Sequence, residues 1–156
     1  MMVRRDVWKA LNGMDEGFFL YSEEIDFFKR LKEKGGRVGF VRESKVYHDL
    51  GSGEALSPTR LRYKFIGEAH YFQKHFNVLR ASICVFLMWL YALSRYAGGC
   101  LLSFKSGHYR QLAKAYKGLV FRPFSWVFGY NSSNADPRKS AGGLGHFKNG
   151  FPECQN

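Results

Sequence analysis

Three acidic side chains, Glu23, Glu24 and Asp26, follow directly on the aromatic run at residues 18–21. The helical periodicity beyond them places all three in the first turn of a helix, with Ser22 as the predicted N-cap. The helix dipole and the unpaired backbone N–H groups favour negative charge at that end. Carboxylates there can serve as a general base or as part of a metal site. The structural alternative is an ordinary helix start, because any helix can carry Asp or Glu in its first turn.

Short elements on either side must position these carboxylates. We expect a short helix, the acidic helix, two short strands and a long helix, at residues 5–11, 23–34, 37–41, 44–48 and 58–76. The acidic helix has an apolar stripe made of Ile25, Phe28 and Leu31, and Gly35-Gly36 is its predicted C-cap. The outward-facing side chains of the long helix are predicted to be Arg60, Arg62, Lys64 and Lys74.

Six pieces of sequence occur in a fixed order within residues 1–79. They are a Met-Val-Arg-Arg element, a Gly-Met-Asp-Glu turn, the aromatic and acidic block, a strand pair ending in a histidine, a Gly/Ser loop and an Arg-rich helix. In this chain they stand at residues 2–5, 13–16, 18–26, 37–48, 51–53 and 58–76. Together they resemble the C-terminal half of the catalytic domain of family 2 glycosyltransferases, especially the rhamnosyltransferase-like branch of bacterial polysaccharide synthesis.

The resemblance implies an α/β fold class. The chain would be the acceptor-side half of a GT-A fold, the fold of nucleotide-diphospho-sugar transferases, followed by a helical membrane-associated extension. Such an enzyme also has a half that binds the nucleotide and carries an Asp-x-Asp metal motif, and no Asp-x-Asp occurs in this sequence. The expectation is therefore a truncated frame, a fragment, or one piece of a split enzyme with a separate N-terminal half.

The resemblance also assigns roles to the acidic block. It implies that Glu24 is the catalytic base and that Glu23 and Asp26 orient the loop or Arg30. It implies that His48 helps to hold a divalent metal, Mg²⁺ or Mn²⁺, on the diphosphate of a nucleotide-sugar donor. Without the family, a lone histidine at a strand end is more often a hydrogen-bonded structural residue.

Substrate contacts are expected from the loop and the Arg-rich helix. The residues concerned are Ser52, Gly53, Arg60 and Arg62. Guanidinium groups match phosphate oxygens, so the two arginines are candidates for a diphosphate on the donor or on a lipid-linked glycan acceptor. The alternative for them is a solvated basic helix face.

An uncharged apolar run occupies residues 81–93, between Arg80 and Arg95. It is too short for an ordinary membrane span, which needs about 20 residues. A longer span would place Arg95 inside the membrane at a cost of about 3 kcal/mol. We expect a helix in the membrane interface, with Trp89, Tyr91 and Tyr96 as anchors. A buried helix and a spanning helix remain as alternatives.

Residues 108–120 predict a basic amphipathic helix after the apolar run. Its apolar face is Leu112, Ala115, Tyr116 and Leu119, and its basic face is Arg110, Lys114 and Lys117. The chain carries a formal net charge of +11, and residues 81–156 have nine Lys or Arg against two Asp or Glu. Each basic residue near an anionic surface contributes about 1 kcal/mol, so an anionic membrane is the expected partner.

Three segments follow from these patterns: a transferase half at residues 1–79, membrane-associated helices at 80–128 and a disordered tail at 129–156. The three cysteines argue against a disulfide framework and a zinc site, and fit a reducing cytoplasm. No apolar signal segment follows Met1. A pI near 9.7 permits nucleic-acid binding, but the basic residues do not interleave with aromatics, so no nucleic-acid partner is expected.

The function implied by the resemblance is transfer of a sugar, rhamnose or another hexose, with inversion at the anomeric carbon. The donor is a nucleotide sugar and the acceptor is a lipid-linked glycan or polysaccharide, at the cytoplasmic face of a bacterial inner membrane. The alternative is a non-catalytic basic membrane-surface module derived from such an enzyme.

Overall fold

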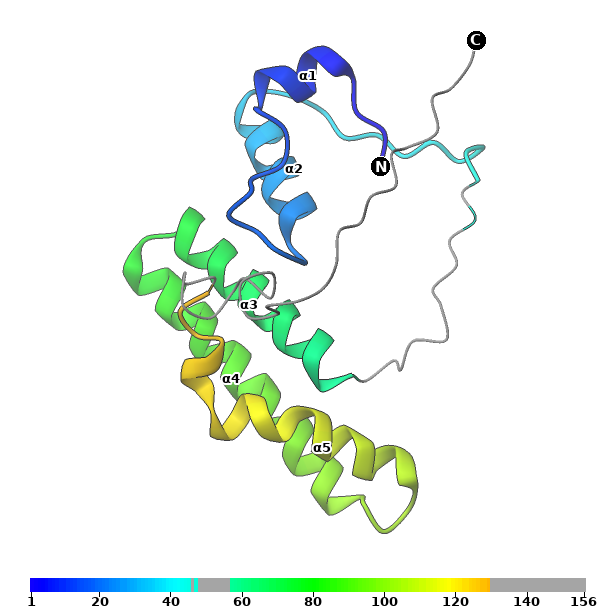
Figure 1. The fold of residues 1–156 in the computed structure, drawn as a ribbon, viewed down its shortest axis with the longest axis vertical. Helices are drawn as coiled ribbons and strands as arrows, with labels where there is room; N and C mark the ends of the chain where they lie inside the picture. The colour runs from blue at the N-terminus through cyan, green and yellow to red at the C-terminus, as the bar shows by residue number, and fades with distance from the viewer. Residues whose placement is uncertain (46, 48–56, 130–156) are drawn as a thin grey trace, which may run out of the picture.

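The computed structural model describes residues 1–45, 47 and 57–129. All regular structure in those residues is helical (Figure 1). The α-helices are α1 (Arg5–Ala10), α2 (Glu23–Glu33), α3 (Pro58–His75), α4 (Val78–Leu101) and α5 (Gly107–Phe121), and a 3₁₀ turn, η1, covers Pro123–Ser125. The predicted α/β fold class and the partial GT-A fold are therefore wrong for the part of the chain that is described.

The predicted strands account for this difference. Residues 37–41 are not in a strand, and the side chains of Val38, Phe40 and Val41 are 61%, 92% and 58% exposed. A strand is stable only when a neighbouring strand satisfies its backbone N–H and C=O groups and covers its apolar face. The described residues provide no such neighbour. The second predicted strand, at 44–48, lies partly outside the described residues.

Helices α4 and α5 form an antiparallel hairpin, and α3 packs along it (Figure 1). The close approach of the two hairpin helices depends on Gly99. A Cβ at that position would lie 2.7 Å from the backbone nitrogen of Ala113 and 3.0 Å from the carbonyl oxygen of Tyr109. A side chain there would force the helices apart, because real Cβ atoms do not approach backbone atoms so closely.

The main core lies between α3, α4 and α5. Its buried side chains include Phe65, Ala69, Val85, Ala92, Leu112, Tyr116, Leu119 and Trp126. Trp126 follows η1 and is completely buried. Its indole Nε1 donates to the carbonyl oxygen of Leu119 at 2.9 Å, and its ring meets Phe65 edge-on at 5.1 Å. The indole thereby fixes the end of α5 against α3.

The N-terminal elements α1 and α2 lie on the other side of α3 from the hairpin (Figure 1). The loop before α2 crosses α3 at Gly67, where a Cβ would lie 2.6 Å from the carbonyl oxygen of Tyr21. Gly35, at φ +75°, ends α2, and the N–H groups of Gly35 and Gly36 donate to Lys32 and Leu31. This is the Schellman arrangement that the Gly35-Gly36 pair predicted.

The predicted core face of α2 is wrong. Ile25 is 53% exposed, whereas Asp26 and Phe27 are completely buried. Phe28 and Leu31 are half-buried. The helix is rotated so that a carboxylate, rather than the apolar stripe, faces α3. The reason is the set of cationic side chains that meets this carboxylate.

Candidate functional site

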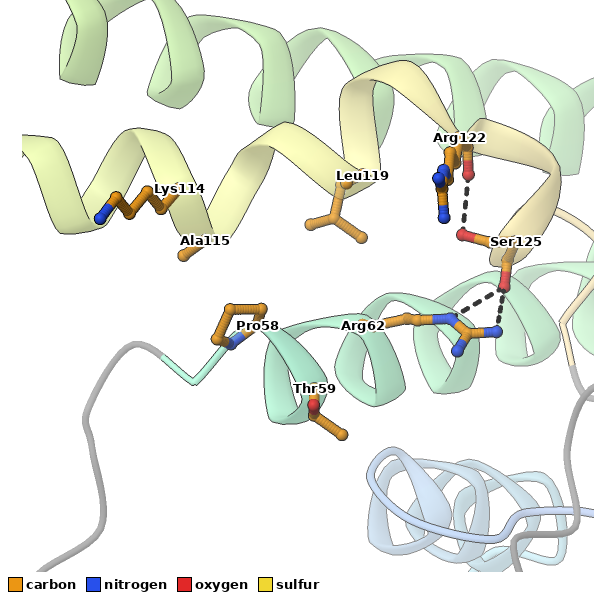
Figure 2. A pocket seen from close by; sticks show the side chains of 9 residues that line it. Pro58, Thr59, Arg62, Lys114, Ala115, Leu119, Arg122 and Ser125 are labelled. Carbon is orange, nitrogen blue, oxygen red and sulfur yellow. Dashed lines mark hydrogen bonds between the residues drawn. The ribbon is translucent and has the colours of Figure 1, made fainter. Parts of the chain in front are cut away.

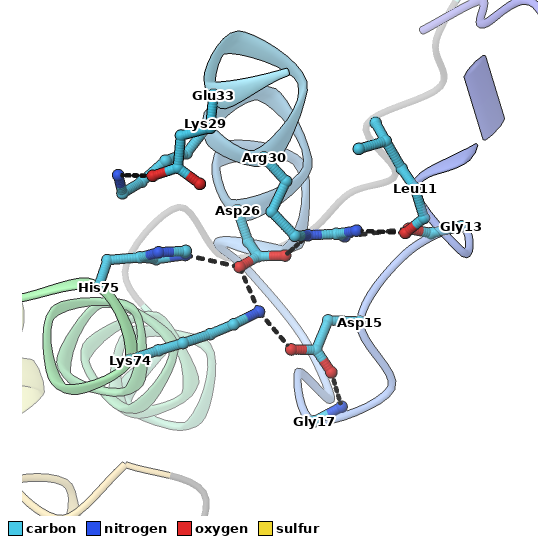
Figure 3. A network of polar contacts seen from close by, with 10 residues as sticks. All are labelled: Leu11, Gly13, Asp15, Gly17, Asp26, Lys29, Arg30, Glu33, Lys74 and His75. Atoms are coloured by element: carbon cyan, nitrogen blue, oxygen red, sulfur yellow. Dashed lines mark hydrogen bonds and ion pairs between the residues drawn. The ribbon is translucent and has the colours of Figure 1, made fainter. Parts of the chain in front are cut away.

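The carboxylate of Asp26 is the centre of a polar cluster that joins α2 to α3 (Figure 3). Oδ2 accepts from Nε of Arg30 at 2.7 Å. Oδ1 accepts from Nζ of Lys74 at 2.5 Å and lies 2.7 Å from Nε2 of His75. Lys74 also bonds to Oδ2 of Asp15 at 2.5 Å. We call these five residues the Asp26 cluster.

The protonation of the cluster follows from its contacts. Burial raises the pKa of Asp26, but hydrogen bonds from Lys74, His75 and Arg30 outweigh it and hold the pKa below the usual aspartate value. The hydrogen bond from Lys74 likewise lowers the pKa of Asp15. Asp26 is thus an ionised carboxylate surrounded by cationic partners. It is a poor general base and a poor metal ligand, because both of its oxygens are already engaged.

Arg30 extends the cluster to the turn before α2. Its Nη1 and Nη2 donate to the carbonyl oxygens of Leu11 at 2.6 Å and Gly13 at 2.9 Å. Asp15 accepts from the backbone N–H of Gly17 at 2.8 Å. The cluster therefore positions the loop that leads into α2, and Lys74, predicted to face outward, points into it. That prediction for Lys74 is wrong.

The other two predicted acids differ from Asp26. Glu24 is exposed in the first turn of α2. Glu23 is half-buried, and its Oε2 atom is buried without a hydrogen-bond partner. Ser22 occupies the predicted N-cap position, but its side chain makes no capping bond. Of the three acids, Glu24 is the one whose carboxylate is open to an incoming molecule.

The backbone just before these acids is strained. Tyr21 and Ser22 both have left-handed conformations, with φ of +68° and +71°. Non-glycine residues adopt this region at a cost of about 1–3 kcal/mol each, and such residues concentrate at functional sites. Packing of the Leu20 and Tyr21 carbonyls on Gly67 of α3 holds the strained turn in place.

The remaining predicted site residues are not all described. His48, Ser52 and Gly53 lie outside the described residues. Arg60 is exposed, and Arg62 is half-buried, with Nε and Nη2 donating to the carbonyl oxygen of Ser125 at 3.4 and 3.3 Å. Within the described ranges no group of three or more His, Cys, Asp or Glu side chains is arranged to hold a metal ion. The expected Mg²⁺ or Mn²⁺ site, which depends on His48, therefore stays a prediction.

Arg62 belongs to a second polar region that the sequence did not reveal (Figure 2). A cavity of about 390 Å³ lies between the start of α3, α5 and η1, and Lys114 and Arg122 line it together with Arg62. Lys114 lies on α5 and Arg122 directly follows the end of that helix, eight residues further along the chain, which the sequence does show. What it could not show is that α3 packs beside that face.

Helix α4 presents an apolar surface to solvent. Its exposed large apolar side chains are Val78, Leu79, Ile83, Phe86, Leu87, Leu90, Tyr91 and Leu101. By length and composition the helix could cross a membrane, and only 11% of its most apolar window is buried. Within the described residues, α4 is therefore buried along one side only, at Ala81, Val85, Ala92 and Gly99. Residues 69–135 contain no Asp or Glu, so the hairpin is both apolar and basic.

Comparisons with protein-family models, with curated proteins and with solved structures give no match to this chain.

Proposed function

We propose that this chain is a membrane-bound part of an enzyme that transfers a sugar from a nucleotide donor, and that Glu24 is its catalytic base. The observation that carries the proposal is the difference in burial and contacts among the three acids of α2. Asp26 is buried among cations and Glu23 is half-buried, whereas Glu24 is exposed at the helix start. The order of sequence pieces around it resembles the family 2 glycosyltransferases.

The chemistry required of Glu24 is simple. Its carboxylate accepts the proton of the acceptor hydroxyl as that oxygen attacks the anomeric carbon, and the nucleoside diphosphate leaves from the opposite face. Single displacement inverts the anomeric configuration. The strained Tyr21-Ser22 turn and the Asp26 cluster hold the first turn of α2 in place, so that the carboxylate needs little reorganisation. Groups that bind the donor and its metal ion would come from outside the described residues.

The hairpin supports a membrane-bound acceptor. The exposed apolar side chains of α4 and the basic residues of α5 suit a helix pair lying in the headgroup region of an anionic bilayer. A sugar acceptor carried on a lipid would be confined to the same surface. Anchoring would therefore raise the local concentration of acceptor at Glu24.

The test is Glu24→Gln in the enzyme completed with its nucleotide-binding part. Turnover should fall at least about a hundredfold with little change in donor affinity, because the amide of the substituted side chain cannot accept the proton of the acceptor hydroxyl. Glu33→Gln is the matched control, since Glu33 is an exposed carboxylate at the other end of the same helix. Near-normal turnover of Glu24→Gln would overturn the assignment and make Glu23 the next candidate.

A second candidate function is favoured by the exposed face of α4. The chain would then be a non-catalytic module that attaches to anionic membranes. Sugar transfer by the enzyme completed with its nucleotide-binding part, beside flotation of the chain with anionic vesicles, separates the two. Firm vesicle attachment without sugar transfer favours the module, and transfer that depends on Glu24 favours the transferase.

A further inference from the structure

We propose that the cavity between α3, α5 and η1 is a binding site for a phosphoryl anion, a phosphomonoester or a diphosphate. We call it the basic cavity. The site is distinct from the acids of α2 and does not depend on sugar transfer. Its volume of about 390 Å³ lies in the range of roughly 300–1,000 Å³ typical of small-molecule sites.

Cations from two helices line the cavity. Arg62 lines it from α3, Lys114 from α5 and Arg122 from the residue after α5, and Figure 2 shows the side chains of Arg62 and Arg122 at the same end of the hollow. Among the described residues, no Asp or Glu lines it. Lys114 and Arg122 have no acid near them along the chain, because residues 69–135 contain none, and Glu68, the next acid along α3 after Arg62, pairs with Lys64. Three cations that share one hollow repel one another, and a bound anion relieves that repulsion.

Hydrogen bonds hold the side chain of Arg62 in a fixed position. Two N–H groups of Arg62 donate to the Ser125 carbonyl, and Oγ of Ser125 donates to the carbonyl oxygen of Arg122 at 2.7 Å (Figure 2). These bonds fix η1 relative to α3 and keep the guanidinium at the cavity wall. The planar guanidinium retains further N–H donors, and its geometry suits phosphate oxygens.

The start of α3 adds further donors. Pro58 and Thr59, the first two residues of the helix, both line the cavity, and Ser57 makes no side-chain capping bond. Pro58 has no N–H group, and that of Leu61 donates to Ser57, but the backbone N–H groups of Thr59 and Arg60 lack intrahelical partners and carry partial positive charge, so they favour an anion. The hydroxyl group of Thr59 can donate as well.

The ligand can come from the membrane or from solution. Phe121 and Phe124, beside Arg122 and Ser125 in the sequence, are 63% and 73% exposed, which suits contact with a bilayer at the cavity rim. A lipid phosphomonoester headgroup and a soluble diphosphate share the chemistry that the cavity recognises. The experiment must therefore contain one arm for each.

The test compares two double variants of the full chain with equal loss of charge. Lys114→Gln/Arg122→Gln removes two cavity cations, and Arg110→Gln/Lys117→Gln removes two cations of α5 that do not line the cavity. The solution arm is calorimetric titration with inorganic pyrophosphate. The membrane arm compares vesicles of phosphatidylcholine containing phosphatidic acid with vesicles containing phosphatidylglycerol at matched surface charge. All four substituted side chains are exposed or line open cavities, and circular dichroism checks the helix content.

The proposal expects the cavity variant to lose at least about tenfold in pyrophosphate affinity, or in its preference for phosphatidic acid over phosphatidylglycerol, with less than about twofold loss of either in the control. Loss with pyrophosphate alone identifies a soluble diphosphate, and loss with phosphatidic acid but not phosphatidylglycerol identifies a lipid headgroup. Equal losses in the two variants would overturn the proposal, because a diffuse basic surface would then explain binding. Absence of both saturable pyrophosphate binding and a preference for phosphatidic acid would overturn it too.

Discussion

The Asp26 cluster and the α4–α5 hairpin differ in whether their charged side chains are paired within the protein. In the cluster every charged group faces an opposite charge within the protein, and the central carboxylate is completely buried. In the hairpin the cations have no acidic partner along more than sixty residues of chain, residues 69–135. The first pattern uses charge to hold elements together. The second leaves both charge and apolar surface available to something outside the chain.

The comparison separates structural from functional acids and bases. Asp26, which lies in the acidic block, is a poor candidate for catalysis because Arg30, Lys74 and His75 already surround it. Arg62 and Lys114, which lie on two distant helices, are good candidates for ligand binding because they meet at one cavity. The number of partners that already surround a charged side chain, rather than its residue type, separates a structural group from a candidate for function.

Removing Asp26 is the most damaging test of the structural side. Asp26→Ala leaves the charged groups of Arg30 and Lys74, and the ring of His75, without the buried carboxylate that holds them together, and the free energy of unfolding should fall by about 3–5 kcal/mol. Urea unfolding followed by circular dichroism measures it. Glu33→Gln is the control, because the exposed Lys29–Glu33 pair should contribute less than about 1 kcal/mol. Equal effects of the two variants would contradict the distinction between the cluster and the surface.

Two adjacent glycines test the hairpin itself. Gly99→Ala places a Cβ 2.7 Å from the backbone nitrogen of Ala113 and should destabilise the fold by about 1–3 kcal/mol. Gly98→Ala meets nothing within 4 Å and should stabilise α4 by up to about 1 kcal/mol, since alanine is the better helix former. Thermal unfolding of both variants gives the sign of each change. Stabilisation by Gly99→Ala would show that α4 and α5 are farther apart than described.

Two isoleucines of similar exposure test the apolar surface. Ile83 on α4 is 50% exposed and Ile25 on α2 is 53% exposed. Ile83→Asp should weaken binding to anionic vesicles about tenfold, which is about 1.4 kcal/mol, whereas Ile25→Asp should leave it nearly unchanged. Both substitutions lower the net charge of the chain by one. A difference in vesicle flotation between the two variants therefore reflects the position of the substituted residue. Equal losses would mean that net charge alone governs attachment.

The smallest expected effect concerns Glu68 on α3. Burial raises the pKa of its carboxyl group above the ordinary glutamate value, although Lys64 lies 3.8 Å away. The ionised form of Glu68 is therefore less favourable in the folded chain than in the unfolded chain. Glu68→Gln should raise the free energy of unfolding by at most about 0.5 kcal/mol, because 33% of the side chain remains exposed and water screens the charge.

The size of this effect should depend on pH. The raised pKa means that the Glu68 carboxyl group destabilises the folded chain only when it is ionised. At a pH low enough for it to be protonated in both the folded and the unfolded chain, it imposes no penalty. The gain from Glu68→Gln should therefore vanish below about pH 4 and appear as the pH rises. Urea unfolding at several pH values measures it. A gain that grows toward acid would contradict the burial argument.

The helices were predictable to different degrees. Residues 108–120 and 58–76 show apolar side chains at helical spacing, and α5 and α3 end within about one residue of those limits. Leu112, Ala115, Tyr116 and Leu119 are all buried, as their spacing indicated. Local periodicity suffices here because a helix forms all its backbone hydrogen bonds within one segment.

The failures concern contacts between segments. Residues 37–41 alternate as a strand would, yet a strand exists only with a partner, which the described residues do not supply. Helix α2 buries Asp26 instead of Ile25 because Lys74 and His75 arrive from α3, 48 and 49 residues further along the chain. No pattern within α2 contains that information.

The amino-acid sequence by itself determined where α1, α3, α4 and α5 form, how α2 ends at Gly35, and that the C-terminal half of the chain is apolar and basic. Those properties depend on neighbouring residues. Only the tertiary structure decided which acid is free, Glu24 rather than Asp26, and that Arg62 meets Lys114 and Arg122 around one cavity. The availability of a charged group depends on the side chains that reach it from distant segments, and packing alone brings those segments together.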